Sequence, residues 1–242
     1  MRRLLTTLAL ILGFSTASFG QATNINRVFY VTAKAGMQAQ FETALKQHIQ
    51  WRKDNGDPWT WEVHQVINGQ NMGEYAVISG GHKWSDFDDY NDFGPKGSQH
   101  YTANVAPLVE SLTSAITATD TTIVRGWEGE YPLRQVIYWK LAPGKTEQFA
   151  EAVGKYHKAF TEKDYPNRYA IIWNVNGGDY DVLVVFPYEN WAAFEGPDTQ
   201  MVEVLQEVYG EKEAKAIAEA FGTSIAETRS LVSLSRPDLS GN

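Results

Sequence analysis

This 242-residue chain contains five histidines, whose side chains exchange a proton most readily near neutral pH. His48 lies in a segment with the apolar spacing of a helix, where it shares one face with Leu45 and Arg52. An imidazole and a guanidinium on the face that meets the rest of the fold could bind a polar ligand or act as a base. The alternative is a core histidine bonded to a backbone group, with Arg52 extending into solvent at the helix end.

A second pair of candidate catalytic residues lies on a predicted strand, Trp59–Ile67. Strand alternation places Glu62 and His64 on the same face. A carboxylate two residues from an imidazole can fix its tautomer and tune it for base catalysis or metal binding. A metal site would also need a third ligand, such as His82 or Asp86, from outside the strand. The alternative is an exposed edge pair without chemistry.

Other familiar motifs are absent or broken. The chain has no cysteine, which excludes a thiol nucleophile and disulfide bonds. The turn at residues 143–146 ends like a phosphate-binding loop, but Trp139 occupies the position of the required first glycine. The acidic run Asp86–Asp92 does not have the spacing of a calcium-binding loop. The sequence therefore predicts no resident cofactor and no metal.

The elements that would position these residues occur twice along the chain. Residues 27–45 align with residues 135–153 at an offset of 108, so that Tyr30 meets Tyr138. The alignment continues for about a hundred residues with only small shifts in register. Such an internal repeat changes the prediction for the whole fold. The counterparts of His48 and Arg52 in the second copy are Tyr156 and Phe160.

Both copies predict the same order of elements: strand, helix, a hairpin of two strands, a second helical region and a final strand. In the first copy we expect the second helical region at Val105–Ala118 and the final strand at Thr122–Trp127. This βαββαβ order is the ferredoxin-like unit. The predicted fold class is therefore α+β, with two tandem ferredoxin-like repeats that close one pseudo-symmetric α+β barrel.

The element order is accompanied by two local motifs. A Pro-Gly-Lys turn at residues 143–145 precedes the helix that carries Phe149, and a Trp-x-x-Phe motif follows the third strand of each copy, at residues 84–87 and 191–194. In these features the chain resembles the dimeric α+β barrel superfamily, including the antibiotic-biosynthesis-type monooxygenases and the NIPSNAP-like proteins. The resemblance implies that the two units pair their sheets within one chain.

The first residues are typical of a secretory signal peptide. Arg2 and Arg3 precede the apolar run Leu4–Phe14, and small residues follow up to a cleavage region near Gly20. The run is shorter than the roughly 20 apolar residues of a membrane span. We expect residues 1–22 to be a signal peptide, residues 25–127 the first repeat, residues 128–133 a linker and residues 134–236 the second repeat.

The expected mature product is a soluble periplasmic or secreted bacterial protein without a stable membrane anchor. Removing Arg2 and Arg3 leaves 19 basic and 29 acidic residues, a formal net charge of −10. This charge argues against a nucleic-acid partner, because such partners require clustered lysine and arginine. A small molecule is the expected partner, and the sequence leaves the oligomeric state open.

Three functions remain open, and the sequence does not decide whether the protein is an enzyme. The first is an unassigned binding function for a small apolar or aromatic ligand, with His48, Arg52, Trp61 and Tyr156 as candidate ligand-binding residues. The second, implied by the resemblance, is a cofactor-independent monooxygenase whose base is His48 or the Glu62–His64 pair. The third is a haem protein of chlorite-dismutase-like architecture, with His157 as the available axial ligand. Because the two copies differ at residues 48 and 52, we expect the ligand in the first half.

Overall fold

A computed structural model describes residues 24–126, 128–129 and 131–241 of the chain. The signal peptide expected at residues 1–22 lies outside these residues. Within them the chain forms eight strands and six α-helices. In chain order these are β1 Ile25–Ala33, α1 Gln38–Asp54, β2 Glu62–Gly69, β3 Tyr75–His82, α2 Trp84–Asp89, α3 Gly94–Asn104, β4 Val109–Arg125, β5 Leu133–Leu141, α4 Thr146–Glu162, β6 Tyr169–Gly177, β7 Val182–Tyr188, α5 Met201–Tyr209, α6 Glu211–Thr223 and β8 Ile225–Ser235.

The strands form one closed antiparallel barrel in the order β1-β3-β2-β8-β5-β7-β6-β4. The first half contributes the neighbours β4-β1-β3-β2, and the second half contributes β8-β5-β7-β6 in the same internal order. The halves meet at two ladders, β2 with β8 and β4 with β6. The structure thus confirms the predicted α+β barrel of ferredoxin-like halves.

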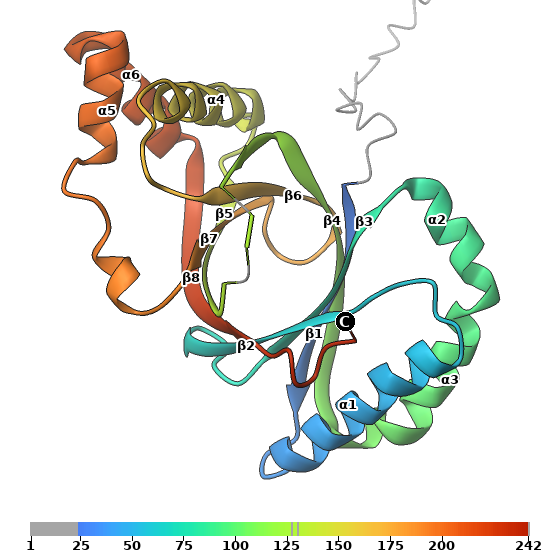
Figure 1. Cartoon of the computed structure of the whole chain (residues 1–242). Helices are drawn as coiled ribbons and strands as arrows, with labels where there is room; N and C mark the ends of the chain where they lie inside the picture. The colour runs from blue at the N-terminus through green and yellow to red at the C-terminus, as the bar shows by residue number, and fades with distance from the viewer. Residues whose placement is uncertain (1–23, 127, 130, 242) are drawn as a thin grey trace, which may run out of the picture.

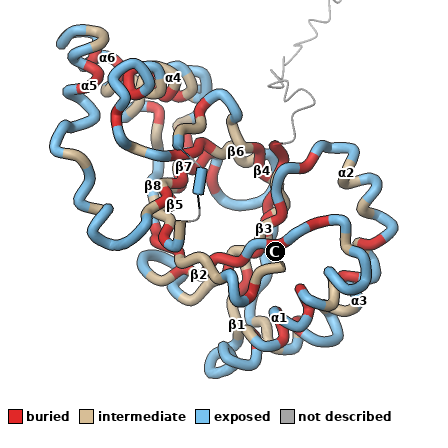
Figure 2. Tube along the Cα trace, viewed as in Figure 1, coloured by how far each residue is buried: buried red, intermediate tan, exposed pale blue. Residues whose placement is uncertain are grey.

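The helices lie outside the barrel, in two groups on opposite sides (Figure 1). The helices α1, α2 and α3 cover the first half, and α4, α5 and α6 cover the second. Side chains alternate between the two faces of each strand, so every strand has one face toward the barrel interior and one toward the helices. Buried residues are accordingly spread along the strands and the inner faces of the helices (Figure 2).

Helix α1 positions the first candidate residues as its spacing predicts. Its buried residues are Phe41, Ala44, Leu45, His48 and Ile49, which lie on the face toward the sheet. The helix ends at Asp54, and Gly56 follows with a φ of 79°. This left-handed conformation favours glycine and turns the chain back toward the sheet.

The helix predicted at Val105–Ala118 was wrong. Helix α3 ends at Asn104, and strand β4 occupies residues 109–125. This segment is rich in threonine, isoleucine and valine, whose branched side chains favour a strand. As a strand, β4 also pairs with β1 on one side and β6 on the other, which no helix could do. The final strand of the first half therefore begins earlier than predicted.

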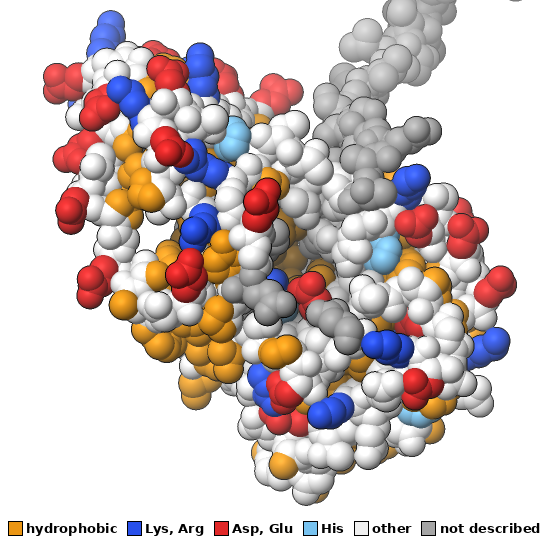
Figure 3. All heavy atoms as spheres, viewed as in Figure 1, with side chains coloured by type: hydrophobic (Ala, Val, Ile, Leu, Met, Phe, Trp, Pro, Cys, Tyr) orange, Lys and Arg blue, Asp and Glu red, His pale blue; other side chains and the backbone are white. Residues whose placement is uncertain are grey.

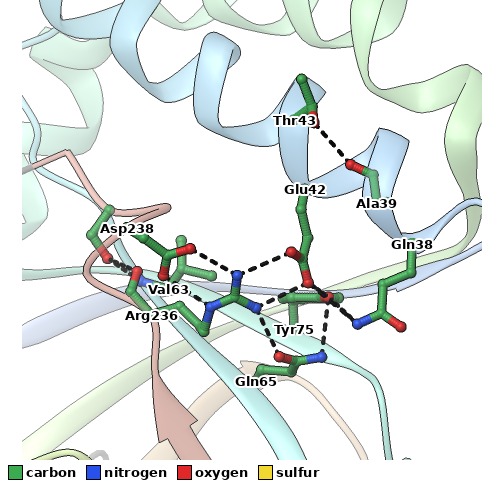
Figure 4. Close-up of polar contacts among 10 residues, drawn as sticks. Gln38, Ala39, Glu42, Thr43, Val63, Gln65, Tyr75, Arg236 and Asp238 are labelled. Atoms are coloured by element: carbon green, nitrogen blue, oxygen red, sulfur yellow. Dashed lines mark hydrogen bonds and ion pairs between the residues drawn. The ribbon is translucent and has the colours of Figure 1, made fainter.

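A polar network joins the end of the chain to the first half (Figure 4). Arg236 follows β8 and donates two hydrogen bonds to Glu42 of α1, at 2.9 and 3.0 Å, and a third to Gln65 of β2. Arg236 also binds Asp238, and the nearby Leu239 is buried against the first-half core. The tail of the second half thus packs between α1 and the barrel.

The ion pair makes stability depend on pH. The hydrogen bonds from Arg236 lower the pKa of Glu42 from 4.5 to about 2. Because the folded-state pKa is the lower one, the stabilisation is complete above about pH 4.5 and is lost as the pH falls toward 2. We expect Arg236→Gln to reduce the free energy of unfolding by about 1–2 kcal/mol at pH 7, after allowance for solvent screening, and by much less at pH 3.

Urea unfolding of wild type and variant at pH 3, 5 and 7 measures this difference. The matched control is Arg168→Gln, which breaks an exposed bridge to Glu189 and should change stability by less than about 0.5 kcal/mol. A difference between wild type and Arg236→Gln that stays constant over this pH range would contradict the assignment.

Candidate functional site

Strand β2 separates the two groups of candidate residues. Glu62 and His64 face the barrel interior, whereas Trp59 and Trp61, both just before the strand, face the helices of the first half. This is the division that strand alternation predicts. The candidate residues therefore belong to two different cavities, one on each side of the barrel wall.

The outer cavity, here called the first-half cavity, lies between the sheet of the first half and its covering helices. It has a volume of about 390 Å³. Arg52 and His48 of α1 meet at 3.3 Å between Nη1 and Nε2, and the Arg52 guanidinium lies 4.8 Å from the Trp61 ring centre. The structure thus brings together three of the four predicted ligand-binding residues. Further wall residues are Phe29, Leu45, Trp59, Tyr90, Tyr101 and Leu112.

The charge of Arg52 is neutralised inside the protein by Asp57. The side chain of Asp57 is fully buried and accepts hydrogen bonds from Arg52 Nε at 2.6 Å and Trp61 Nε1 at 3.0 Å. The backbone N–H of Trp59 donates to its second oxygen at 3.0 Å, and Tyr90 donates a longer bond. Arg52 does not extend into solvent, because only 12% of its side chain is exposed. This pair fixes the orientation of both groups at the cavity wall.

His48 is neutral, and both of its ring nitrogens are engaged. Arg52 can only donate, so Nε2 of His48 accepts, and Nδ1 must carry the proton. Nδ1 then donates to Nδ1 of His100 at 2.9 Å. Burial, together with the charges of Arg52 and His100, lowers the pKa of His48 to about 3. His48 is therefore a positioned polar group and not an available base.

Tyr101 supplies a polar atom without a partner. Its hydroxyl is buried at the wall of the first-half cavity, and no donor or acceptor among the described residues reaches it. A buried hydroxyl left unpaired costs about 1–3 kcal/mol. A ligand oxygen that accepted its proton would remove this cost. Among the groups around the cavity, this hydroxyl is the one that most directly indicates a ligand.

The corresponding region of the second half has an aromatic core. Tyr156 packs against Phe160 and Phe221 at ring distances of 5.7 and 5.6 Å. Tyr156 therefore lies far from His48, Arg52 and Trp61, in the core of the other half. The two halves have the same strand order but fill the space beneath their helices differently.

The second half does not offer a fitting site for haem. His157 is half-buried, and its Nδ1 is bonded to the hydroxyl of Tyr169 at 2.9 Å. The space between sheet and helices is filled by interlocked rings with centres 5.4–5.8 Å apart, those of Trp139, Phe149, Trp173 and Phe221. A macrocycle could enter only by displacing this core.

The Glu62–His64 pair lies inside the barrel and not at an exposed edge. His64 Nε2 lies 3.4 Å from Glu62 Oε2, and Arg134 Nη2 of β5 approaches the same oxygen at 3.6 Å. The hydrogen bond from His64 and the charge of Arg134 lower the pKa of Glu62, and burial lowers the pKa of His64. The pair is thus a carboxylate and a neutral imidazole, and Arg134 from the second half completes it.

The proposed third metal ligands do not join this pair. His82 is bonded to Ser79 at 2.8 Å and stacked on Trp59, on the outer side of the barrel wall. Within the residues that the structure describes, no group of three or more histidine, aspartate and glutamate side chains is placed to bind a metal ion. In the same part of the chain, no helix is long and apolar enough to cross a membrane.

Sequence reasoning missed the Tyr101 hydroxyl and three charged or titratable groups at these cavities. Asp57 lies in the loop after α1, His100 lies on α3, and Arg134 lies on the neighbouring half. The only sequence signal for Asp57 is its place just past Gly56, where the chain turns back toward Arg52. For His100 and Arg134 no local pattern indicates the contact, because both meet their partners through tertiary packing.

No known protein family matches this sequence, and no curated protein matches it. Solved structures do match the fold. A candidate monooxygenase from Lactobacillus acidophilus is 8% identical, with a TM-score of 0.56 over 87% of this chain and 93% of that one. Chlorite dismutase from Candidatus Nitrospira defluvii is 10% identical, with a TM-score of 0.54 over 90% and 93%. An anthrone oxidase-like protein is 11% identical, with a TM-score of 0.53 over 89% and 92%. These likenesses establish a shared α+β barrel fold.

The buried carboxylate of Asp57 gives a direct test of the site's construction. Replacing it by Asn leaves the largely buried Arg52 without a counter-ion, so we expect Asp57→Asn to destabilise the protein by about 3 kcal/mol or more. Asp54→Asn is the matched control, since Asp54 is exposed and accepts a hydrogen bond from Gln50; it should change stability by less than about 0.5 kcal/mol. Urea unfolding at pH 7 measures both. Similar effects for the two variants would contradict this role for Asp57.

Proposed function

We propose that this protein is an exported binding protein for a small, uncharged aromatic molecule held in the first-half cavity. The observation that carries this proposal is the hydroxyl of Tyr101, buried and without a partner at the wall of an aromatic-lined cavity. Export rests on the signal-peptide pattern of residues 1–22.

The chemistry of the walls defines the ligand class. Aromatic rings line the cavity, as in most small-molecule sites, and favour a flat apolar body. Arg52 is paired with Asp57, and His48 is neutral, so these polar groups add no net charge. Next to His48 and Arg52, a charged group on the ligand would thus be buried without a counter-ion at a high cost. Arg27, the other charged residue of the wall, lies over the Phe29 ring, 5.0 Å from its centre. Tyr101 can donate a hydrogen bond, which favours a carbonyl or ether oxygen on the ligand.

A cofactor-independent monooxygenase is the second candidate, favoured by the names of two proteins with the same fold. Chemistry of this kind needs a base beside the substrate. In the first-half cavity His48 is bonded at both nitrogens and has a pKa of about 3, and the Glu62–His64 pair faces the other side of the barrel wall. The geometry therefore supports binding more strongly than catalysis.

The internal repeat supports the further proposal that the chain arose by duplication of one ferredoxin-like unit, as the resemblance to the antibiotic-biosynthesis-type monooxygenases and NIPSNAP-like proteins implies. The same strand order in both halves supports this origin. The second half then retained an aromatic core, and the first half acquired the polar groups of α1 and its loop.

A test uses 2-acetylnaphthalene, which has a flat body and one carbonyl, and Tyr101→Phe. Removing the unpaired hydroxyl should leave the free protein as stable as wild type or more stable by about 1 kcal/mol. The same change should weaken binding of 2-acetylnaphthalene about tenfold, because the hydrogen bond to the carbonyl is lost. These opposite effects separate a ligand contact from a structural one. Titration calorimetry and urea unfolding measure them.

Tyr156→Phe is the matched control from the second half and should bind like wild type. A ligand at 100 times its Kd should stabilise wild type by about 2.7 kcal/mol, which thermal unfolding detects. Absence of binding to wild type, or equal weakening by Tyr101→Phe and Tyr156→Phe, would refute the site. Oxygen uptake on addition of the compound would instead favour the monooxygenase.

A further inference from the structure

We infer that the interior of the barrel is a second binding site, which takes a small uncharged ring compound bearing hydroxyl groups. This barrel-interior cavity has a volume of about 340 Å³ and is enclosed by the inward faces of strands from both halves. In the space-filling view, which looks along the barrel, the surface is hollowed at the barrel centre, with charged side chains at the rim (Figure 3). The cavity lies on the opposite side of β2 from the first-half cavity, so the inference is independent of the function proposed above.

One end of the cavity carries a carboxylate with unused hydrogen-bonding capacity, that of Glu62. The contacts of Glu62 with His64 and Arg134, at 3.4 and 3.6 Å, are longer than the 2.7–2.9 Å typical of charge-assisted hydrogen bonds. The Glu62 side chain is 52% exposed, and a carboxylate can accept several further bonds. This end therefore offers an acceptor, Glu62, whose charge is balanced by Arg134.

His64 provides a second, separate indication of a ligand. Its side chain is only 4% exposed and forms part of the cavity wall. Since Nε2 donates to Glu62, Nδ1 is the unprotonated nitrogen, and no donor in the described part of the chain reaches it. A buried acceptor without a donor is rare in proteins and favours a bound hydroxyl group.

The other end of the cavity carries three tyrosines from both halves. The hydroxyls of Tyr30 and Tyr180 are 3.0 Å apart, and the Tyr138 ring lies edge-on to Tyr180 at 4.9 Å. Burial raises the pKa of all three, so each hydroxyl keeps its proton and can both donate and accept. Between the two ends the wall is apolar and includes Val66 and Val136.

These walls select an uncharged hydroxylated ring. Glu62 and Arg134 balance each other, His64 is neutral, and burial raises the pKa of Glu74, the other carboxyl of the wall, so a charged ligand would leave an uncompensated charge inside the barrel. The Glu62 end offers acceptors, Glu62 and Nδ1 of His64, and the tyrosine end offers both donors and acceptors. A hydroxyl group is the common neutral group that can bond at each end. The apolar middle section suits a ring. A benzene ring with two hydroxyls can therefore donate a hydrogen bond to Glu62 or His64 while its ring lies against the apolar middle section.

The test measures binding of resorcinol to the full mature chain by ligand-observed NMR and titration calorimetry. We expect a Kd of about 1 mM or tighter, and no binding of toluene or benzoate. Glu62→Gln should weaken resorcinol binding about tenfold, because a charge-assisted hydrogen bond is lost. Ala76→Leu fills the cavity beside His64 without changing any charge and should abolish binding. Tyr101→Phe, in the first-half cavity, should bind resorcinol like wild type.

Two interior variants are used so that the test remains decisive if one of them folds poorly. Glu62→Gln changes the charge of the cavity wall, and Ala76→Leu changes the cavity volume. Circular dichroism and urea unfolding identify folded variants. Failure of resorcinol to bind wild type would overturn the inference. Wild-type affinity for resorcinol in whichever interior variant folds would also overturn it. Loss of binding in Tyr101→Phe alone would overturn it too, because that result would place resorcinol in the first-half cavity. Binding of benzoate as tight as that of resorcinol would overturn the uncharged ligand class.

Discussion

Closure of the eight strands into a barrel is the constraint on which the rest of this structure depends. The ladders between β2 and β8 and between β4 and β6 leave no open sheet edge between the halves. Closure also assigns every side chain of a strand to one of two environments, the common interior or the helix-covered outer face. Polar residues that are neighbours in sequence, such as Trp61 and Glu62, therefore line separate cavities.

Each cavity contains an arginine paired with a carboxylate, but the partners have different origins. In the first-half cavity Arg52 and Asp57 come from one helix and the loop that follows it, so the ion pair belongs to one half. In the barrel interior Glu62 and Arg134 come from different halves and meet only because the barrel is closed. A buried charge without its partner is strongly destabilising. The interior pair therefore links the polar chemistry of the cavity to the association of the halves.

The two halves show how one topology can hold different cores. Both have the same strand order, but interlocked aromatic rings fill the second half, whereas the first half places His48, Arg52 and Tyr101 around a cavity. The three solved structures of the same fold described above are only 8–11% identical to this chain. At such distances function depends on the groups grafted onto the fold and not on the fold itself.

The sequence by itself determined the features that depend on local periodicity. It gave the internal repeat, the α+β fold class, the face of α1 that carries His48 and Arg52, and the division of β2 between its two faces. It misassigned the start of β4, because a short segment of mixed periodicity takes its structure from pairing with β1 and β6. Only the tertiary structure decided that Asp57 neutralises Arg52, that His100 engages His48, and that Arg134 reaches Glu62. The physical reason is that periodicity acts between neighbours along the chain, whereas these contacts exist only once loops turn and the barrel closes.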